Sequence, residues 1–292
     1  FEDKPYIVAD NTHSRFAGNL YIGWTQDRLA DARIVFSRST DDGRTWSAPI
    51  QLSTEPAMPR DENGTVEGFD GVVTPDGRLH VVWSGPHDDL RYTVSSDGGK
   101  SFVPPRTIAA TGPAHFRVFG LPHGNGYPQI VATTGANDAS NLYVTWSDYR
   151  NGELDVFCIA SHNAGRSWSH PVRVETDPPH DGADHFLQWL AADPATGDIY
   201  AVFYDRRQDP TERTAQIVLA RSTDGGRSFS NYVWSQKPFD TNGVTVGDYT
   251  GLSARNGVVL GVWAETRPIA GQRRVPTVVV VGRAVFPAGS GQ

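Results

Sequence analysis

Four arginines recur at one fixed position in this sequence, four residues after an aromatic residue that ends an apolar stretch. An acidic residue stands one or two positions before each of them. A guanidinium group is planar and can donate two parallel hydrogen bonds to one carboxylate. If the four side chains converge, the sequence predicts a site that binds the carboxylate of a ligand. The four are Arg28, Arg150, Arg207 and Arg267, which follow Trp24, Trp146, Phe203 and Trp263.

The same spacing also has a structural interpretation. A feature present in nearly every repeat is what arginine–aspartate pairing between neighbouring repeats would produce. Residues that depart from the repeat are therefore more informative about chemistry, although a lone histidine is more often structural than catalytic. The departures are His87, His123, Asp184, His185, Gln188, Trp189, Asp248 and Tyr249. Those that we predict to bind substrate are His87, His123, Gln188 and Trp189.

Composition excludes several classes of function. The formal net charge of -7 at pH 7 argues against a nucleic-acid binder, which needs a basic face. No apolar run approaches the ~20 residues of a membrane span. The single Cys158 lies in an alternating, strand-like segment and is expected to be an inert core thiol. Neither H-E-x-x-H nor C-x-x-C spacing occurs, so no metal and no cofactor are predicted.

The first residues of the sequence are relevant to the cellular localisation of the protein. Phe1 begins directly in a strand-like segment, without the pattern of a signal peptide. Such a chain is either cytosolic or the processed form of a secreted protein. Of these we expect the second, secreted or periplasmic, and a monomer.

One turn motif occurs four times with the pattern S-x-D-x-G-x-x-W/F. In such a turn, Asp or Asn accepts hydrogen bonds from nearby backbone N–H groups, Gly adopts a positive φ and the aromatic residue packs on the sheet. Four copies indicate a repeat architecture. The copies begin at Ser39, Ser95, Ser161 and Ser222, and the third has Asn163 in place of aspartate.

Strand-like segments that end in an aromatic residue recur in step with the turn, about 60 residues apart, which gives five repeats. In the first repeat, residues 5–10, 20–24, 33–37 and 49–52 read as four strands. A four-stranded sheet cannot bury both faces alone, whereas radial packing of several sheets does so. We therefore predict an all-β fold, a single β-propeller domain over residues 1–292, with a six-bladed ring as the alternative. The predicted four-stranded antiparallel blades span approximately 1–53, 64–108, 126–174, 184–235 and 246–286.

The turn motif also orients the blades. In an up-and-down blade, the turn between strands three and four shares a face with the turn between strands one and two. The opposite face holds the loops between strands two and three and the starts of the first strands, which converge on a central funnel. Function is expected on that opposite face.

These turns, in this order on four-stranded repeats, resemble the Asp-box (BNR-repeat) sialidase superfamily over essentially the whole chain. The segment from Asp248 to Leu252, followed by a strand ending in Glu265, is similar to the sialidase segment that carries the nucleophilic tyrosine. By this resemblance Tyr249 is the nucleophile. A phenol needs a neighbouring base, which is Glu265, or else Gln188 or Asp184 from an earlier inner strand.

The resemblance also implies the remaining roles. Asp27, with Asp31 as second choice, is the acid/base residue. Arg207 and Arg267 match the carboxylate-binding arginines, and Arg150 or Arg28 completes the set. Two features depart from the family: Lys4 stands where sialidases carry an arginine before Ile-Pro, and five repeats are visible where catalytic sialidases have six.

Three functions follow as hypotheses. The first is a sialidase-like exo-glycosidase that acts on an acidic sugar by a retaining mechanism with a tyrosine nucleophile. The second is a non-catalytic propeller that binds a glycan or a protein. The third is a uronate polysaccharide lyase that uses His123 or His87 with a tyrosine. The expected partner is an acidic glycan or glycoconjugate, and neither nucleic acid nor a membrane span is expected.

Overall fold

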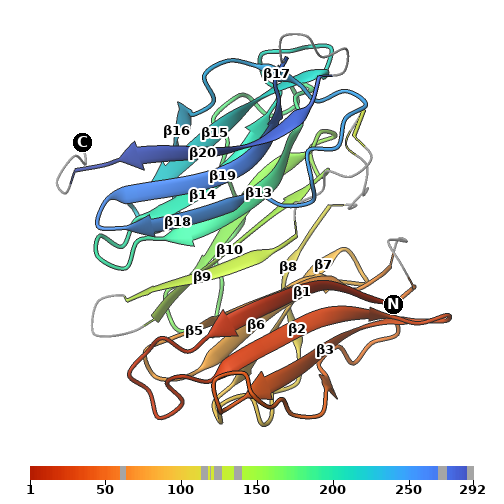
Figure 1. The fold of residues 1–292 in the computed structure, drawn as a ribbon, viewed down its shortest axis with the longest axis vertical. Helices are drawn as coiled ribbons and strands as arrows, with labels where there is room; N and C mark the ends of the chain where they lie inside the picture. The colour runs from red at the N-terminus through yellow and green to blue at the C-terminus, as the bar shows by residue number, and fades with distance from the viewer. Residues whose placement is uncertain are drawn as a thin grey trace. The chain divides into compact units, whose positions relative to one another are not determined.

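Every regular element in the described part of this computed structural model is a β-strand. The structure describes residues 1–59, 64–112, 118, 120–121, 127–134, 140–268 and 275–287. Within these residues there is accordingly no helix that could cross a membrane. The strands form five antiparallel sheets, in which consecutive strands pair in chain order (Figure 1). This organisation is consistent with a propeller and agrees with the all-β prediction.

The first three sheets have four strands each. The first contains β1 (Glu2–Ala9), β2 (Leu20–Asp27), β3 (Ala32–Ser39) and β4 (Ile50–Gln51). The second contains β5 (Glu67–Val73), β6 (Leu79–Gly85), β7 (Asp89–Ser95) and β8 (Arg106–Ala110). The third contains β9 (Gln129–Thr134), β10 (Ser140–Asp148), β11 (Asp155–Ser161) and β12 (Val172–Arg173).

The last two sheets differ in size. The fourth contains β13 (His185–Ala192), β14 (Ile199–Asp205), β15 (Thr214–Ser222) and β16 (Ser230–Val233), and β17 (Phe239–Asp240) also pairs with β15. The fifth has three strands: β18 (Gly251–Arg255), β19 (Val258–Thr266) and β20 (Thr277–Val285).

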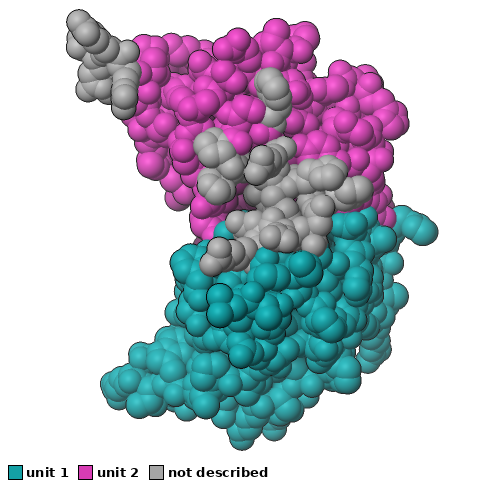
Figure 2. Space-filling view, turned by 90° about the vertical axis from the view of Figure 1, so that its right-hand side faces the viewer, with its two compact units in different colours: residues 1–111, 127–144, 161–170 teal, residues 112–126, 145–160, 171–292 magenta. Residues whose placement is uncertain are grey.

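The chain divides into two compact units, coloured separately in Figure 2. The first unit comprises residues 1–111, 127–144 and 161–170, and the second comprises 112–126, 145–160 and 171–292. In the first unit the inner strand β1 lies against β5, and β5 against β9. In the second unit β13 lies against β18 in the same way. Within each unit, successive sheets therefore meet through their first strands, as propeller blades do.

The middle strands of the third and fourth sheets are the most deeply buried. All seven residues of β11 and all seven of β14 are buried, as expected for strands covered on both faces. Cys158 lies in β11, and burial raises the pKa of its thiol to about 12, so its predicted place in the core is confirmed. By contrast, β20 alternates between exposed and half-buried residues, so one face of the fifth sheet is open to solvent.

The repeated turn has the hydrogen bonds that its residue types predict. In the first copy, the Ser39 hydroxyl donates to Asp41 at 2.8 Å and accepts from the Gly43 amide at 2.9 Å. Asp41 also accepts from the amide and hydroxyl of Thr45, at 2.9 and 2.6 Å. Gly43 has a φ of +80°, which a residue with a side chain rarely adopts. Asn163 supports the third copy in the same way, through the Ser167 amide at 2.9 Å.

Three of the first strands carry a β-bulge near their start. The register shifts between Asp3 and Tyr6, between Glu67 and Asp70, and between Phe186 and Trp189. In each bulge one residue has a positive φ: 51° at Lys4, 76° at Gly68 and 52° at Leu187. Bulges of this kind redirect side chains and are common beside functional sites.

Candidate functional site

The recurring arginines of the third and fifth sheets form ion pairs with acids two residues before them. Arg150 contacts Asp148 at 2.6 Å, and Arg267 contacts Glu265 at 2.5 Å. A tryptophan indole N–H donates to the same carboxylate in each sheet: from Trp146 to Asp148 at 2.7 Å, and from Trp263 to Glu265 at 3.0 Å. We call this arrangement the indole–acid–arginine clip. It lies within one sheet, so it differs from the pairing between repeats that the sequence suggested.

The fourth sheet has a modified clip, because Phe203 replaces the tryptophan and offers no N–H. Arg207 still contacts Asp205 at 2.5 Å. The place of the indole is taken by His185, whose Nε2 lies 3.5 Å from Asp205 and whose ring packs edge-on against Phe203. Burial tends to raise the pKa of Asp205, but the proximity of His185 and Arg207 holds it below its usual value.

Several predicted site residues belong to the first unit. Asp27 is buried at the end of β2, where its amide donates to the Phe1 carbonyl at 2.8 Å. Arg28 is half-exposed and lies 3.8 Å from Asp31. His87 is exposed. Lys4 forms ion pairs with Asp3 at 2.8 Å and Glu67 at 3.1 Å.

The other predicted residues lie in the second unit, apart from His123, which lies outside the described residues. Tyr249 precedes β18 and is 43% exposed, so solvent reaches its side chain. Glu265 is buried and already accepts from Trp263 and Arg267. Gln188 is buried in β13, and Trp189 packs on the apolar core of this unit.

A pocket of about 550 Å³ opens in the second unit. It lies at the loops between second and third strands and at the start of a first strand, the kind of position where the sequence predicts function. Three carboxylates and a phenol face it, with apolar side chains as one wall. Its lining comprises Val118, Gly120, Leu121, Tyr149, Gly152, Glu153, Gly182, Asp184 and Glu212.

Local hydrogen bonds fix two of the three acids of this pocket. Glu153 is buried and accepts from the backbone amides of His180 and Gly182, so it anchors the loop before β13. Asp184 is 5% exposed and accepts from the Leu154 amide at 2.9 Å. Glu212 is only half-buried and has a φ of 51°.

Hydrogen bonds to the Asp209 side chain stabilise the loop that carries Glu212. The Asp209 carboxylate accepts from the amides of Thr211 at 2.9 Å and Thr214 at 2.8 Å, and from both threonine hydroxyls. These hydrogen bonds keep the pKa of Asp209 well below its usual range. The left-handed backbone at Glu212 is therefore maintained by a rigid turn, as a positioned functional side chain requires.

Burial raises the pKa values of both central acids of the pocket. Burial raises the pKa of Asp184, while the Leu154 amide and Arg206 oppose that rise. Burial and the charge of Asp184 both raise the pKa of Glu212. Burial and these two acids also raise the pKa of Tyr149, which remains a neutral phenol. Two carboxyl groups with raised pKa values in a single pocket are candidates for an acid/base pair.

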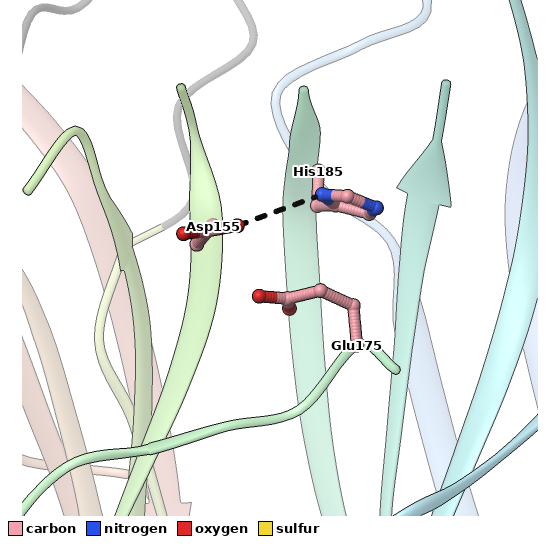
Figure 3. Close-up of side chains that lie close together, drawn as sticks. All are labelled: Asp155, Glu175 and His185. Carbon is pink, nitrogen blue, oxygen red and sulfur yellow. Dashed lines mark ion pairs between the residues drawn. The ribbon is translucent and has the colours of Figure 1, made fainter. Parts of the chain in front are cut away.

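A second polar group lies buried nearby, around His185 (Figure 3). Asp155 at the start of β11, Glu175 after β12 and His185 at the start of β13 offer ligand atoms within 4.8 Å of one another. Asp177 and Asp205 lie 3.4 and 3.5 Å from the Nε2 atom of His185. Nearby carboxylates outweigh burial and raise the pKa of His185 to about 9, whereas burial raises that of Glu175 to about 8.

Sequence reasoning missed most of this arrangement. It identified Asp184 and His185 as departures from the repeat, but not Tyr149, Glu153 or Glu212 as pocket residues. All three lie in loops between second and third strands, the face where the sequence predicts function, so their position could have indicated them. Nothing in the spacing of residues 155, 175 and 185 indicates that they meet, because β12 lies between them in the chain.

Comparison with known proteins identifies the fold but no closer relationship. No family model and no curated protein matches the sequence. The intramolecular trans-sialidase from Ruminococcus gnavus is similar in structure, with a TM-score of 0.56 and 12% identity over 98% of this chain and 85% of that chain. The Penicillium chrysogenum α-L-arabinanase has a TM-score of 0.52 and 15% identity over 97% of this chain and 93% of that chain.

A third similar structure is the catalytic domain of the Coprinopsis cinerea GH62 α-L-arabinofuranosidase. Its TM-score is 0.51, with 13% identity over 97% of this chain and 90% of that chain. All three neighbours have the β-propeller fold. At these identities the likeness concerns the fold alone, and chemistry has to be argued from the residues of this chain.

Proposed function

We propose that this protein is a glycoside hydrolase whose acid/base pair is Asp184 and Glu212. The observation that carries the proposal is the pocket of about 550 Å³ in which both carboxyl groups have raised pKa values. Hydrolysis of a glycosidic bond needs one carboxylic acid to protonate the leaving oxygen and one carboxylate to act as base or nucleophile. The structural neighbours include a trans-sialidase, an arabinanase and an arabinofuranosidase, which supports the same class of reaction.

The environment of each acid assigns its role. Asp184 accepts the Leu154 amide and lies near Arg206, and both interactions favour its ionised form. Burial and the charge of Asp184 favour the protonated form of Glu212, whereas Arg206 and the Asp184 amide oppose it. Because Glu212 is the more exposed of the two acids, we assign it as the general acid and Asp184 as the base or nucleophile. Tyr149 remains protonated and can donate a hydrogen bond to a sugar oxygen.

The pocket favours a neutral sugar over an acidic one. Three carboxylates line it, and a ligand carboxylate would be repelled by those that are ionised. The recurring arginines Arg150, Arg207 and Arg267 of this unit already bind acids of the protein. The buried apolar side chains of Val118 and Leu121 provide a surface for the carbon face of a sugar ring.

The test is hydrolysis of a panel of fluorogenic glycosides that includes arabinofuranosides, xylosides and sialosides. We expect turnover of a neutral glycoside, and Glu212→Gln should lower kcat roughly 100- to 10,000-fold. Asp42→Asn, which removes an exposed carboxylate from a turn, is the matched control. A Glu212→Gln variant with the activity of the wild type would refute the assignment.

The second candidate is the sialidase-like reaction, a retaining exo-hydrolysis of an acidic sugar with Tyr249 as nucleophile. The half-exposed phenol of Tyr249, two residues before β18, favours it, since a nucleophile must be reachable. In this mechanism Asp27 is the acid/base residue and Glu265 the base, and Arg207 and Arg267 bind the substrate carboxylate. Those arginines would have to exchange their protein partners for the ligand.

The two candidates give opposite results in one experiment. Sialoside turnover that is lost in Tyr249→Phe and kept in Glu212→Gln establishes the second candidate. Loss in Glu212→Gln with a neutral substrate establishes the first. Saturable glycan binding without any product from the panel would instead identify a non-catalytic binding propeller, and an unsaturated product absorbing in the near ultraviolet would identify a lyase.

A further inference from the structure

We propose that Asp155, Glu175 and His185 form a binding site for a divalent transition-metal ion, with Zn²⁺ as the best-matched ion. The three side chains come from the start of β11, the segment after β12 and the start of β13, and they lie close together in Figure 3. All three are buried, and none of them lines the open pocket that contains Asp184 and Glu212. Nothing in the proposal depends on the glycosidase chemistry.

The distances suit an ion better than they suit direct contact. His185 Nδ1 and Asp155 Oδ1 are 4.0 Å apart, too far for a hydrogen bond. Because the three ligand atoms lie within 4.8 Å of one another, some point lies within about 2.8 Å of each. Side-chain adjustments of under about 1 Å would then give zinc–nitrogen and zinc–oxygen bonds of about 2.1 Å.

His185 supplies the second, independent observation. Its side chain is fully buried, and neither ring nitrogen has a hydrogen bond of acceptable geometry within the described part of the chain. A buried polar atom without such a bond is costly, and native proteins seldom keep one without a ligand or water. The ring is directed into the group of acids, with Asp155 near Nδ1 and Asp177 and Asp205 near Nε2.

The charges around His185 leave room for a dication. Four carboxylates, Asp155, Glu175, Asp177 and Asp205, face only two guanidinium groups, Arg173 and Arg207. A metal ion binds the neutral imidazole and the ionised carboxylates, so it has to displace the protons that His185 and Glu175, with pKa values of about 9 and about 8, hold at pH 7. With those two protons displaced, the net charge of this set is -2, which one divalent ion balances. Buried charges are retained when they are paired or coordinate a metal.

Arg173 does not block the site. Its Nη2 donates to Asp155 at 2.9 Å and its Nε donates to Glu175 at 2.8 Å, so it fixes both carboxylates from its partly exposed side. The Asn151 amide holds the other oxygen of Asp155 at 2.5 Å. Outer partners of this kind orient metal ligands and are a regular part of such centres.

The donor set selects the class of ion. One imidazole nitrogen with two carboxylates suits zinc or manganese, whereas calcium prefers oxygen ligands alone and more of them. The bound ion would join the third sheet to the fourth within the second unit, so it should stabilise that unit against unfolding.

The experiment uses the whole chain, freed of metal with EDTA and then dialysed against Zn²⁺ or Ca²⁺. We expect one Zn²⁺ per chain by elemental analysis and a rise in Tm with Zn²⁺ but not with Ca²⁺. His185→Gln and Glu175→Gln should each weaken Zn²⁺ binding by more than about 100-fold. Co²⁺ bound to the wild type should give the visible absorption of a nitrogen–oxygen site, which needs no variant to fold.

The matched control is His80→Gln, which removes another fully buried histidine. His80 contacts Thr74 and Tyr92 in the first unit and has no acidic cluster around it. This variant should lose stability but keep the Zn²⁺-dependent rise in Tm. The proposal fails if the wild type binds no Zn²⁺, if Ca²⁺ stabilises it equally, or if His185→Gln and Glu175→Gln bind Zn²⁺ as the wild type does.

Discussion

The third and fourth sheets differ at one aromatic position, and the sheet that keeps the tryptophan uses its arginine for structure. In the third sheet, Trp146 and Arg150 both bind Asp148, and the clip is complete. In the fourth, Phe203 leaves Asp205 without an indole partner, and His185 occupies that side. Where the repeat is intact, its arginine is structural. Where it is broken, a histidine and several acids collect in the interior.

The largest expected effect concerns Asp70, a buried acid that belongs to no indole–acid–arginine clip. Asp70 of β5 accepts hydrogen bonds from the amides of Gly71 and Ile130, each at 2.8 Å, and burial raises its pKa to about 7. Because the folded pKa is above the unfolded value, the folded state holds this proton more tightly. The contribution of Asp70 to stability is therefore fully present below about pH 4 and is lost as pH rises from about 4 to about 7, by roughly 4 kcal/mol at most.

Chemical denaturation at a series of pH values, with wild type and Asp70→Asn, measures this contribution. The variant should lose the part of the pH slope between about pH 4 and 7 that the wild type shows. An identical slope in both proteins would contradict the assignment. By contrast, Asp205 lies beside His185 and Arg207, and its pKa is lowered. Asp70 and Asp205 therefore represent buried acids without and with cationic partners.

Removing the arginine of an intact clip should be the next largest effect. Asp148 is fully buried, so Arg150→Ala leaves its charge without a cation and should destabilise the fold by about 3 kcal/mol. The guanidinium also lies 4.3 Å from the centre of the Phe157 ring, a contact that is lost as well. Urea denaturation gives the loss, and Asp148→Asn with Arg150→Ala should recover part of it. If Arg150 instead binds substrate, KM will rise without a loss of stability.

Placing the tryptophan of the repeat in the fourth sheet tests whether His185 has taken the place of the indole. Phe203 is fully buried against His185, so Phe203→Trp overfills that space and should cost about 2 kcal/mol. With His185→Ala in the same chain, the new indole has room to approach Asp205, and the loss should shrink. Thermal unfolding of the single and double variants measures both changes. If Phe203→Trp costs as much in the His185→Ala background as in the wild type, His185 does not occupy the place of the indole.

The sequence predicted the sheets well because their signals are local. Each turn motif closes on itself, as the hydrogen bonds between Ser39, Asp41 and Thr45 show, so its residues specify its geometry. The site depends on contacts between distant segments. Glu212 gains its raised pKa from Asp184, and His185 meets Asp155 only after two loops have folded. The roles predicted for Tyr249, Asp27 and Glu265 remain predictions.

The smallest effect expected is the loss of one indole hydrogen bond. Trp146→Phe reproduces in the third sheet the residue that the fourth sheet has naturally, and it removes the 2.7 Å bond to Asp148. Arg150 still binds that carboxylate, so the acid keeps a cation, and the loss should be about 1 to 2 kcal/mol by urea denaturation. Trp263→Phe in the fifth sheet is the matched control. Glu265 is slightly more exposed than Asp148, and water can replace part of the lost bond, so its loss should be smaller. Equal losses would show that the indole contributes through its packing rather than through its N–H.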